Sequence, residues 1–286
     1  MIIADSGSTK TAWCVTGDEI AEEYINTEGI NPFFQSESDI IHVLKEQLLP
    51  HISIGHHPRS IYFYGAGCST PEKIEILKRS FSSIFNLPIH IKVNHDLLGA
   101  ARSTCGNDPG LVGILGTGSN SCVYDGVNIV ENVASLGYIL GDEGSGAHIG
   151  KTFLKVVFEN KLPKKLIENF ILDFKLTREE VLGQIYGQKF PNRFLASITK
   201  FIYPYKDDPA VAAILEYCFE AFVDHNLCKY QNFKQLNFYC TGSIGFYFSD
   251  ALKSVLGKRG INLVKIQQSP ILGLVNYHKL HTFDKL

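Results

Sequence analysis

Two short turns rich in glycine and small hydroxyl residues are the first features of this sequence that suggest chemistry. The earlier one reads Asp5-Ser6-Gly7-Ser8-Thr9-Lys10-Thr11. The backbone N–H groups of such a turn, supplemented by hydroxyls and a lysine, can surround phosphate oxygens. Asp5, at the end of the strand before the turn, is well placed to hold Mg²⁺ through water. The same composition is also typical of a plain hairpin, so this turn alone does not decide between the two interpretations.

The second turn, Gly116-Thr117-Gly118-Ser119-Asn120-Ser121, repeats this chemistry more than a hundred residues later. Two such turns from duplicated domains can hold one polyphosphate from both sides. Other nucleotide motifs fit less well. The GxGxxG pattern fails because Ser121 stands where the third glycine belongs. The P-loop pattern that would end at Gly150-Lys151-Thr152 has Ser145 in place of its first glycine, and two acids just before it would repel a phosphate.

Those two acids, Asp142 and Glu143, lie between glycines and ahead of an expected helix over residues 149–158. Carboxylates on such a loop can accept hydrogen bonds from a polyhydroxyl ligand or orient a hydrated metal. Alternatively, they complement the positive end of the helix dipole, which is worth about 0.3–1 kcal/mol.

Asp96 and Asn31 each allow two interpretations. Asp96 follows a strand expected over residues 88–93, where a general base beside a cleft belongs. It is also a good N-cap for a helix over residues 97–104. Asn31, in Gly29-Ile30-Asn31-Pro32, can present its amide to a substrate, although the sequence alone favours a turn.

The elements that must position these residues form a repeated pattern. Each half opens with three short strands, continues with a strand, a small-residue turn and a helix, and then adds another strand. In the first half, Thr70 is the expected N-cap of the helix. Further helices are expected after the capping box at Thr177 and after Asp208-Pro209. The expected strands are 2–4, 11–15, 20–25, 61–64 and 88–93, then 111–115, 121–124, 127–133, 236–240 and 261–266, with helices over 71–85 and 246–256.

The composition limits the function classes. The 286 residues, 45% of them hydrophobic, suggest two domains that each bury a core. A net charge of -2 argues against a nucleic-acid-binding surface. The sequence contains no apolar run long enough for a membrane span and begins without a signal-peptide pattern. Its 7 cysteines show no CxxC spacing, which favours reduced thiols in a cytoplasmic protein.

Taken together in chain order, the motifs resemble the N-acetylglucosamine kinase family, within the actin-like sugar kinases and BadF/BadG/BcrA/BcrD-type ATPases. They are Asp5 to Thr11, Asn94-His95-Asp96, Leu115 to Asn120, Leu140 to Ser145 and Cys240 to Ser243. The resemblance implies an α/β fold of two duplicated actin-like (ribonuclease H-like) lobes, with mixed sheets flanked by helices and a cleft between them. The expected lobes are residues 1–106 and 107–269, with a C-terminal helix of about 270–286 packing back on the first.

The resemblance also implies a reaction and its site. ATP and Mg²⁺ would serve to phosphorylate an amino sugar, N-acetylglucosamine at its 6-hydroxyl, with Asp96 as the base. Adenosine would lie near Gly242 and Ser243. The implied phosphate contacts are Ser8, Thr9, Lys10, Thr117 and Gly118; the implied sugar contacts are Asn31, Asn120 and Asp142, beside Glu143 on the same acidic loop. The expected partners are the small-molecule sugar and neither nucleic acid nor a membrane, with a homodimer left open.

The sequence departs from the family pattern at several positions. Ser6 and Ser8 stand where the first loop usually has glycine, and Leu136 replaces a tryptophan beside the sugar. Two other functions on the same fold remain alternatives. One is an ATPase activator of a radical dehydratase, for which Cys105 and Cys122 have no cluster-like partner motif. The other is a non-catalytic sugar or nucleotide sensor.

Overall fold

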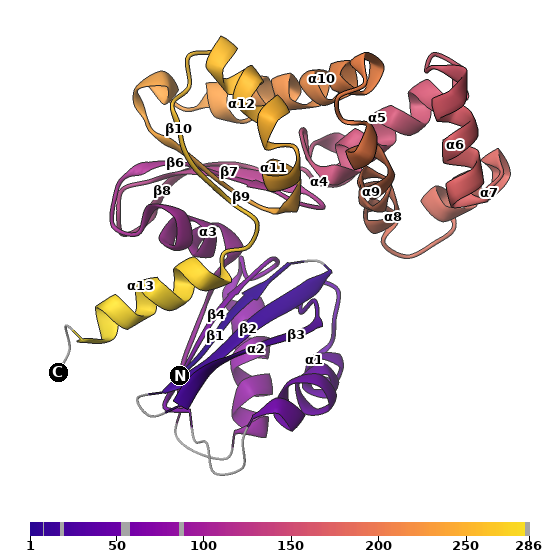
Figure 1. Cartoon of the computed structure of the whole chain (residues 1–286). Coiled ribbons are helices and arrows are strands. Elements are labelled where there is room, and N and C mark those ends of the chain that lie inside the picture. The colour runs from indigo at the N-terminus through magenta and orange to yellow at the C-terminus, as the bar shows by residue number, and fades with distance from the viewer. Residues whose placement is uncertain (8, 18–19, 53–57, 86–88, 284–286) are drawn as a thin grey trace. The chain divides into compact units, whose positions relative to one another are not determined.

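The computed structural model describes residues 1–7, 9–17, 20–52, 58–85 and 89–283. The chain divides into two compact units (Figure 1). The first unit comprises Met1–Asp108, Gly126–Asn128 and Ser269–Leu286, and the second comprises Pro109–Asp125 and Ile129–Gln268. Among the described residues, we find no helix that combines the length and the apolar character needed to cross a membrane.

A five-stranded mixed sheet forms the centre of the first unit, in the order β3-β2-β1-β4-β5. Strands β1, β2 and β3 form an antiparallel meander, and β4 and β5 run parallel to β1. The strands are β1 (Ile2–Ser6), β2 (Lys10–Gly17), β3 (Ile20–Glu28), β4 (Ser60–Gly65) and β5 (His90–His95).

Helices cover both faces of this sheet. On one face, Trp13 and Phe63 pack with Phe81 of α2 (Pro71–Ile84) and with α1 (Glu37–Val43), which continues as a π-helical turn (Leu44–Leu48) and a 3-10 turn (Leu49–His51). On the other face, Tyr64 packs with Leu274 of α13 (Ile271–Phe283) and with α3 (Asp96–Cys105). As predicted, Thr70 caps α2 by accepting a hydrogen bond from the Lys73 N–H.

The second unit repeats the topology of the first. Its sheet has the order β10-β9-β6-β7-β8, with β6, β7 and β8 antiparallel and β9 and β10 parallel to β6. This repetition confirms the predicted duplication. The strands are β6 (Gly110–Leu115), β7 (Ser119–Tyr124), β8 (Ile129–Val133), β9 (Phe238–Thr241) and β10 (Leu263–Gln267).

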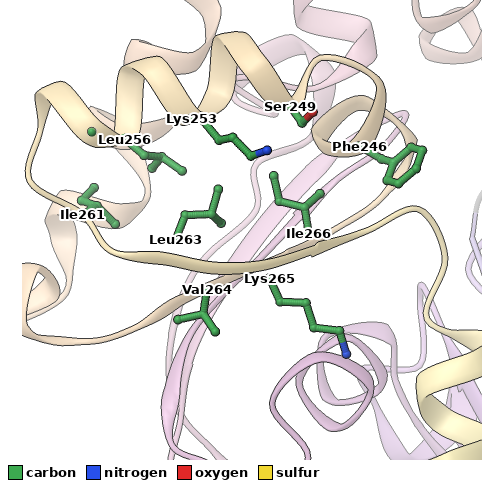
Figure 2. Close-up of a pocket in the computed structure, with 10 residues that line it drawn as sticks. Phe246, Ser249, Lys253, Leu256, Ile261, Leu263, Val264, Lys265 and Ile266 are labelled. Atoms are coloured by element: carbon green, nitrogen blue, oxygen red, sulfur yellow. The ribbon is translucent and has the colours of Figure 1, made fainter.

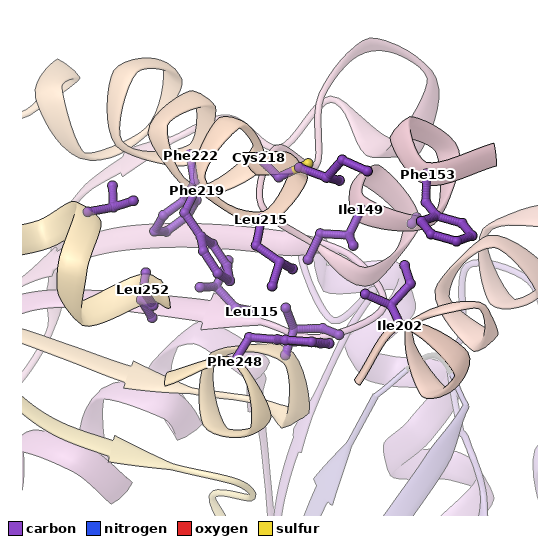
Figure 3. Packing of buried hydrophobic residues seen from close by; sticks show 14 of the residues in the cluster. Leu115, Ile149, Phe153, Ile202, Leu215, Cys218, Phe219, Phe222, Phe248 and Leu252 are labelled. Carbon is purple, nitrogen blue, oxygen red and sulfur yellow. The ribbon is translucent and has the colours of Figure 1, made fainter. Parts of the chain in front are cut away.

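The core of the second unit lies between its sheet and a layer of helices. Figure 3 shows Leu115 of the sheet facing Leu215 and Phe219 of α10, together with Ile149 of α5. The helices are α4 (Gly137–Leu140), α5 (Gly146–Phe158), α6 (Lys164–Phe174), α7 (Arg178–Tyr186), α8 (Pro191–Ser197), α9 (Thr199–Ile202), α10 (Pro209–His225), α11 (Ser243–Tyr247) and α12 (Ser249–Lys258). Three 3-10 turns accompany them: Tyr203–Tyr205, Leu227–Lys229 and Phe233–Gln235.

The helices of this unit confirm one prediction and correct another. The capping box at Thr177 is present, because Thr177 and Glu180 each bond the other's backbone N–H. The single helix predicted over residues 246–256 is wrong, since α11 and α12 are separated at Phe248. Phe248 leaves the helical conformation (φ −104°, ψ 29°) and buries its ring against Tyr203, so tertiary packing overrides the local helical pattern.

Candidate functional site

The hairpin between β1 and β2 is held in place by buried hydroxyl groups. Ser6 and Thr11, paired across its base, lie with their side-chain oxygens 2.6 Å apart. Both oxygens accept a hydrogen bond from the Ile30 N–H, at 3.0 and 3.2 Å. Ser6, where the family pattern has glycine, therefore ties the loop after β3 to the turn. Within the turn, the Gly7 N–H donates to the Lys10 carbonyl at 3.0 Å, and the side chains of Thr9 and Lys10 are exposed.

Asp5 lies near the end of β1, in register with Tyr64 of β4. Burial, reinforced by the charge of Asp96 and partly offset by Lys10, raises the pKa of Asp5 to about 7. A buried carboxylate near a second negative charge is an oxygen donor that a divalent cation would neutralise. In the described part of the chain, no three or more His, Cys, Asp or Glu side chains form a metal-binding group. Asp5 nevertheless fits Mg²⁺, which often takes one or two carboxylates and completes its coordination with phosphate and water.

Asp96 begins α3, directly after β5. His95 occupies the N-cap position, so the N-cap predicted at Asp96 is wrong by one residue. The reason is that the backbone of His95 is still extended (φ −67°, ψ 148°), whereas Asp96 is already helical. The Leu97 N–H donates to Asp96 Oδ1 at 2.8 Å, and His95 Nδ1 lies 2.7 Å from the same oxygen.

The pKa of His95 is subject to opposing influences. Burial acts to lower it, but the hydrogen bond to Asp96 and the negative charge of that carboxylate raise it above its ordinary value. Asn94, one residue earlier, has a buried side-chain nitrogen that has no hydrogen-bond partner among the described residues. A polar atom in that situation usually marks a position where water or a ligand binds.

Asn31 stabilises a turn, as its sequence context favours. Its Oδ1 accepts a hydrogen bond from the Phe33 N–H at 2.9 Å, and its own N–H donates to Gln35 Oε1 at 2.7 Å. The side chain lies against Gly67, where an added Cβ would come within 2.1 Å of Asn31 Oδ1. Because the turn uses the amide oxygen, Nδ2 is the group with which Asn31 would bind a sugar.

The corresponding hairpin of the second unit is held by main-chain groups instead. At the start of α5, the Gly146 N–H donates to the Gly116 carbonyl at 2.8 Å, and the Ala147 N–H donates to the Thr117 carbonyl at 3.1 Å. These bonds fix the turn and leave the side chain of Thr117 half-buried. Lys151 lies inside α5, so the exclusion of a P-loop is confirmed: the segment is helical and not a phosphate-binding loop.

Asp142 connects the acidic loop to this hairpin. Its Oδ1 accepts hydrogen bonds from the Ser119 N–H and the Ser135 hydroxyl, both at 3.3 Å. Oδ2 lies so close to Gly118 that an added Cβ would come within 2.9 Å of it. Burial raises the pKa of Asp142 in spite of these two bonds, and nearby Glu143 adds to the increase. The backbone of Asp142 is left-handed (φ 58°), which a non-glycine residue adopts at a cost.

Asn120 follows the hairpin on β7, and Glu143 follows Asp142 on the acidic loop. Asn120 Oδ1 accepts hydrogen bonds from the Ser121 N–H at 2.9 Å and from Asn132 Nδ2 at 3.1 Å. Both bonds use the oxygen, so Nδ2 is the group with which Asn120 would bind a hydroxyl. Glu143 is half-buried.

Gly242 lies at the end of β9, beside the end of β6. Its φ of +117° falls in the region that favours glycine, and an added Cβ would come within 2.2 Å of the Leu115 carbonyl oxygen. Its N–H donates to the Gln267 carbonyl at 3.0 Å. The next residue, Ser243, is exposed and begins α11.

Within each unit, the structure brings several of the predicted residues together at one edge of the sheet. In the first unit, these are Asp5 and Asp96, whose charges interact. In the second unit, they are Gly118 and Asp142, with Gly242 beside the end of β6. Ser8 lies outside the described residues.

Several residues without a predicted role contact this site. His95 contacts Asp96, Ser135 contacts Asp142, and Ser6 bonds the loop that carries Asn31. For His95, the available signal was a polar residue next to an acid at a strand-to-helix junction. For Ser6 and Ser135, no local pattern predicts the partner, because the bonded groups lie 24 and 7 residues away in the chain.

A separate pocket of about 500 Å³ lies between α12 and β10. Figure 2 shows Leu263 and Ile266 pointing toward α12, while Val264 and Lys265 point to the opposite side of the strand. The lining includes no predicted site residue and follows the outer edge of the sheet. It is therefore not the candidate site.

Comparison with known proteins identifies relatives of the whole chain. No protein-family model matches the sequence, and no curated protein matches it either. The solved structure of a "putative N-acetylglucosamine kinase" from Porphyromonas gingivalis is 42% identical, with a TM-score of 0.92 over 97% of this chain and 98% of its own.

Two more distant structures show the fold alone. One is a "putative N-acetylglucosamine kinase" from Chromobacterium violaceum, 18% identical with a TM-score of 0.73 over 96% of this chain and 98% of its own. The other is a ROK family glucokinase from Streptomyces griseus in complex with glucose and AMPPNP, 15% identical with a TM-score of 0.54 over 98% of each chain. Together with the two repeated sheets, these similarities confirm the predicted α/β fold of the actin-like sugar kinases.

Proposed function

The chain belongs to the N-acetylglucosamine kinase family of ATP-dependent sugar kinases, and on that premise we propose that it phosphorylates an amino sugar, N-acetylglucosamine, at the 6-hydroxyl. The observation that carries this proposal is the 42% identity with the Porphyromonas gingivalis protein over 97% of the chain. A carboxylate at the start of α3, next to a second carboxylate on β1, supports it, since phosphoryl transfer to a hydroxyl needs a proton acceptor and counter-charge.

Asp96 acts as the general base in this proposal. Its carboxylate accepts the proton of the sugar hydroxyl while the oxygen attacks the γ-phosphorus of ATP. The bond from that phosphorus to the β,γ-bridging oxygen breaks, and ADP leaves. Proton removal of this kind contributes about 10²–10⁴-fold to the rate. When bound, Mg²⁺ supplies positive charge to the phosphate oxygens, and Asp5 is the residue that would hold it.

The two hairpins supply contacts to the phosphates. In the first unit, the contacts come from Ser8, Thr9 and Lys10, and the exposure of Thr9 and Lys10 suits that role. In the second unit, Thr117 and Gly118 contribute from a turn whose carbonyls are already bonded to α5, so its geometry is set before ATP binds. Gly242 and Ser243 contact adenosine.

Four polar side chains bind the sugar. The amide nitrogens of Asn31 and Asn120 donate to its hydroxyl or carbonyl oxygens, because bonds to their own surroundings use both amide oxygens. Asp142 and Glu143 accept from sugar hydroxyls. A buried acceptor left unpaired by an unsuitable substrate is costly, so these groups would select among hexoses.

The test is a panel of hexoses and hexosamines with Mg-ATP, scored as ADP formation above a blank without sugar. We expect the largest rate with N-acetylglucosamine and none with its 6-deoxy analogue, which lacks the attacking hydroxyl. Equal ADP formation with the 6-deoxy sugar would contradict the assigned position. Failure of every sugar would favour the sensor, and a coloured protein that binds an iron–sulfur cluster would favour the dehydratase activator.

A further inference from the structure

The junction between β5 and α3 holds the carboxylate of Asp96 in one orientation. His95 Nδ1 lies 2.7 Å from Asp96 Oδ1 and 3.2 Å from the Leu97 nitrogen. A ring nitrogen so close to a carboxylate oxygen must carry the proton, because two acceptors at that distance would repel each other. The Leu97 N–H donates to Asp96 Oδ1 at 2.8 Å, a closer contact than the 3.2 Å between its nitrogen and the ring nitrogen.

Both of these donors reach the same carboxylate oxygen. Oδ1 receives the imidazole N–H and a main-chain N–H, and no described residue donates a hydrogen bond to Oδ2. An oxygen that accepts two hydrogen bonds has less electron density to offer a third proton. The geometry points to His95 as a positioning residue: it holds Oδ1 of Asp96 so that Oδ2 is the oxygen presented to the substrate hydroxyl. This inference rests on the proposed function, in which Asp96 is the base.

The other side chains near Asp96 show why its contact with His95 matters. Asp5, on β1, and Cys68, after β4, both have a pKa that is raised first by burial and then by the charge of Asp96. A second carboxyl group on β1 and a buried thiol therefore both lie within reach of the charge of Asp96. Among the described residues, the imidazole of His95 is the side chain in hydrogen-bond contact with this carboxylate, so it is the group that can fix the carboxylate's orientation.

The experiment compares two substitutions at His95 with a control on the same strand. His95→Ala removes the donor, whereas His95→Asn places an amide N–H close to the position of Nδ1. His90→Ala changes an exposed histidine of β5 and should leave the kinetics unchanged. We expect His95→Ala to lower kcat about 10–100-fold, because a misplaced base is far less effective. The KM values for ATP and for the sugar should stay within about twofold, since neither ground-state contact is removed.

Rescue by the conservative variant separates positioning from a merely structural role. His95→Asn restores a donor to Asp96 Oδ1 and should recover most of kcat, with both KM values unchanged. Circular dichroism and thermal melting verify that each variant is folded.

Several results would overturn the inference. Wild-type kcat in His95→Ala would do so, as would equal losses of kcat in His95→Ala and His95→Asn. An inactive wild-type protein would instead contradict the proposed function, and the sugar panel detects that first. In that case, NMR titration of His95 still tests the bond: its pKa should fall in Asp96→Asn, and an unchanged titration would overturn the contact itself.

Discussion

In the first unit, the hairpin between β1 and β2 is held by side-chain hydroxyls, whereas in the second unit the hairpin between β6 and β7 is held by the main chain of α5. Ser6 and Thr11 share the Ile30 N–H, while the Gly116 and Thr117 carbonyls each receive an N–H from the helix. The two sheets have the same strand order and the same mixture of parallel and antiparallel pairs. One topology thus supports its turns by two different means.

The carboxylates of the two units also differ in their surroundings. Burial, reinforced by the charge of Asp96, raises the pKa of Asp5 to about 7. Asp142, in contrast, is bonded by two donors and wedged against Gly118. The first arrangement suits proton transfer and a cation, and the second suits a fixed binding contact. In the proposed function, the first unit thus supplies the base and the metal-binding carboxylate, and the second unit supplies a carboxylate held for binding the sugar. Each of the following variants tests one side of this difference.

The largest effect is expected at Asp96. Asp96→Asn should lower kcat about 10²–10⁴-fold, because an amide cannot accept the proton of the hydroxyl. Binding of ATP, followed by calorimetry, should change less than about twofold. Asp142→Asn should act mainly on the KM for the sugar, since Asn keeps an oxygen that the Ser119 N–H can bond.

The matched control for this pair is Asp108→Asn, an exposed acid of the first unit that should behave like the wild type. A coupled ADP assay measures all three variants. Normal turnover by Asp96→Asn would end its assignment as the base. A loss of kcat in Asp142→Asn as large as that in Asp96→Asn would remove the distinction between the units.

The second effect concerns the stability of the second unit. Gly242→Ala would place a Cβ 2.2 Å from the Leu115 carbonyl oxygen in a backbone with φ +117°, so strand β9 or β6 must shift. We expect a loss of about 3–5 kcal/mol in the free energy of unfolding. Gly257→Ala, within α12 and with no atom within 4 Å of an added Cβ, should be neutral or stabilising by up to about 1 kcal/mol. Urea unfolding measures the stability of both variants. Similar unfolding free energies would contradict the close approach of Gly242 to the Leu115 carbonyl.

Local sequence patterns predicted most of the strands and several helix starts. Thr70 and Thr177 cap their helices as expected, because capping depends on residues only three positions apart. The break at Phe248 could not be predicted this way, since it depends on burial against Tyr203, 45 residues earlier in the chain. The hydroxyl network of the first hairpin is likewise long-range, because Ser6 bonds a residue 24 positions later.

Local sequence patterns likewise predicted only part of the candidate site. Its glycines and acids follow strand ends, so their types and spacing predicted which residues gather at each sheet edge. The orientation of each side chain required the structure. The orientation of the Asp142 carboxylate depends on a left-handed backbone and on Ser135. The orientation of the Asp96 carboxylate depends on a ring nitrogen of the preceding residue. Neither partner follows from periodicity or from turn chemistry.

A third variant weakens the hairpin of the first unit through its hydroxyls. Thr11→Val removes an oxygen that bonds Ser6 and the Ile30 N–H and donates to the Glu28 carbonyl. Leaving those buried groups unpaired should cost about 1–3 kcal/mol of unfolding free energy. Thr11→Ser keeps the oxygen and should lose less than about 1.5 kcal/mol, because only a methyl group is removed. Equal losses in urea unfolding would show that packing, and not hydrogen bonding, holds this turn.

The smallest effect is a pH dependence in the first unit, where α13 packs on the sheet. His278 is buried, its Nε2 lies 2.9 Å from the Tyr64 hydroxyl, and its ring stacks on Tyr62. Burial, followed by the charges of Arg102, His281 and Lys92, lowers the pKa of His278 to about 3. The unfolded chain binds a proton at this site near pH 6.5, so the stability that His278 contributes is complete above that pH and is lost as the pH falls.

Between pH 7.5 and 5.5, this residue should therefore cost about 1.4 kcal/mol of unfolding free energy, since one pH unit below the unfolded pKa corresponds to that amount. His278→Gln removes the titrating ring. The difference in unfolding free energy between pH 7.5 and 5.5 should therefore shrink by this amount, whatever the stability of the variant at pH 7.5. His42→Gln, at an exposed histidine of α1, should keep the wild-type slope. Urea unfolding at both pH values measures the three proteins. An equal pH dependence of the unfolding free energy in His278→Gln and in the wild type would mean that α13 accommodates a charged histidine. The sheet face that α13 covers would then be less tightly packed than the contact between His278 and Tyr64 indicates.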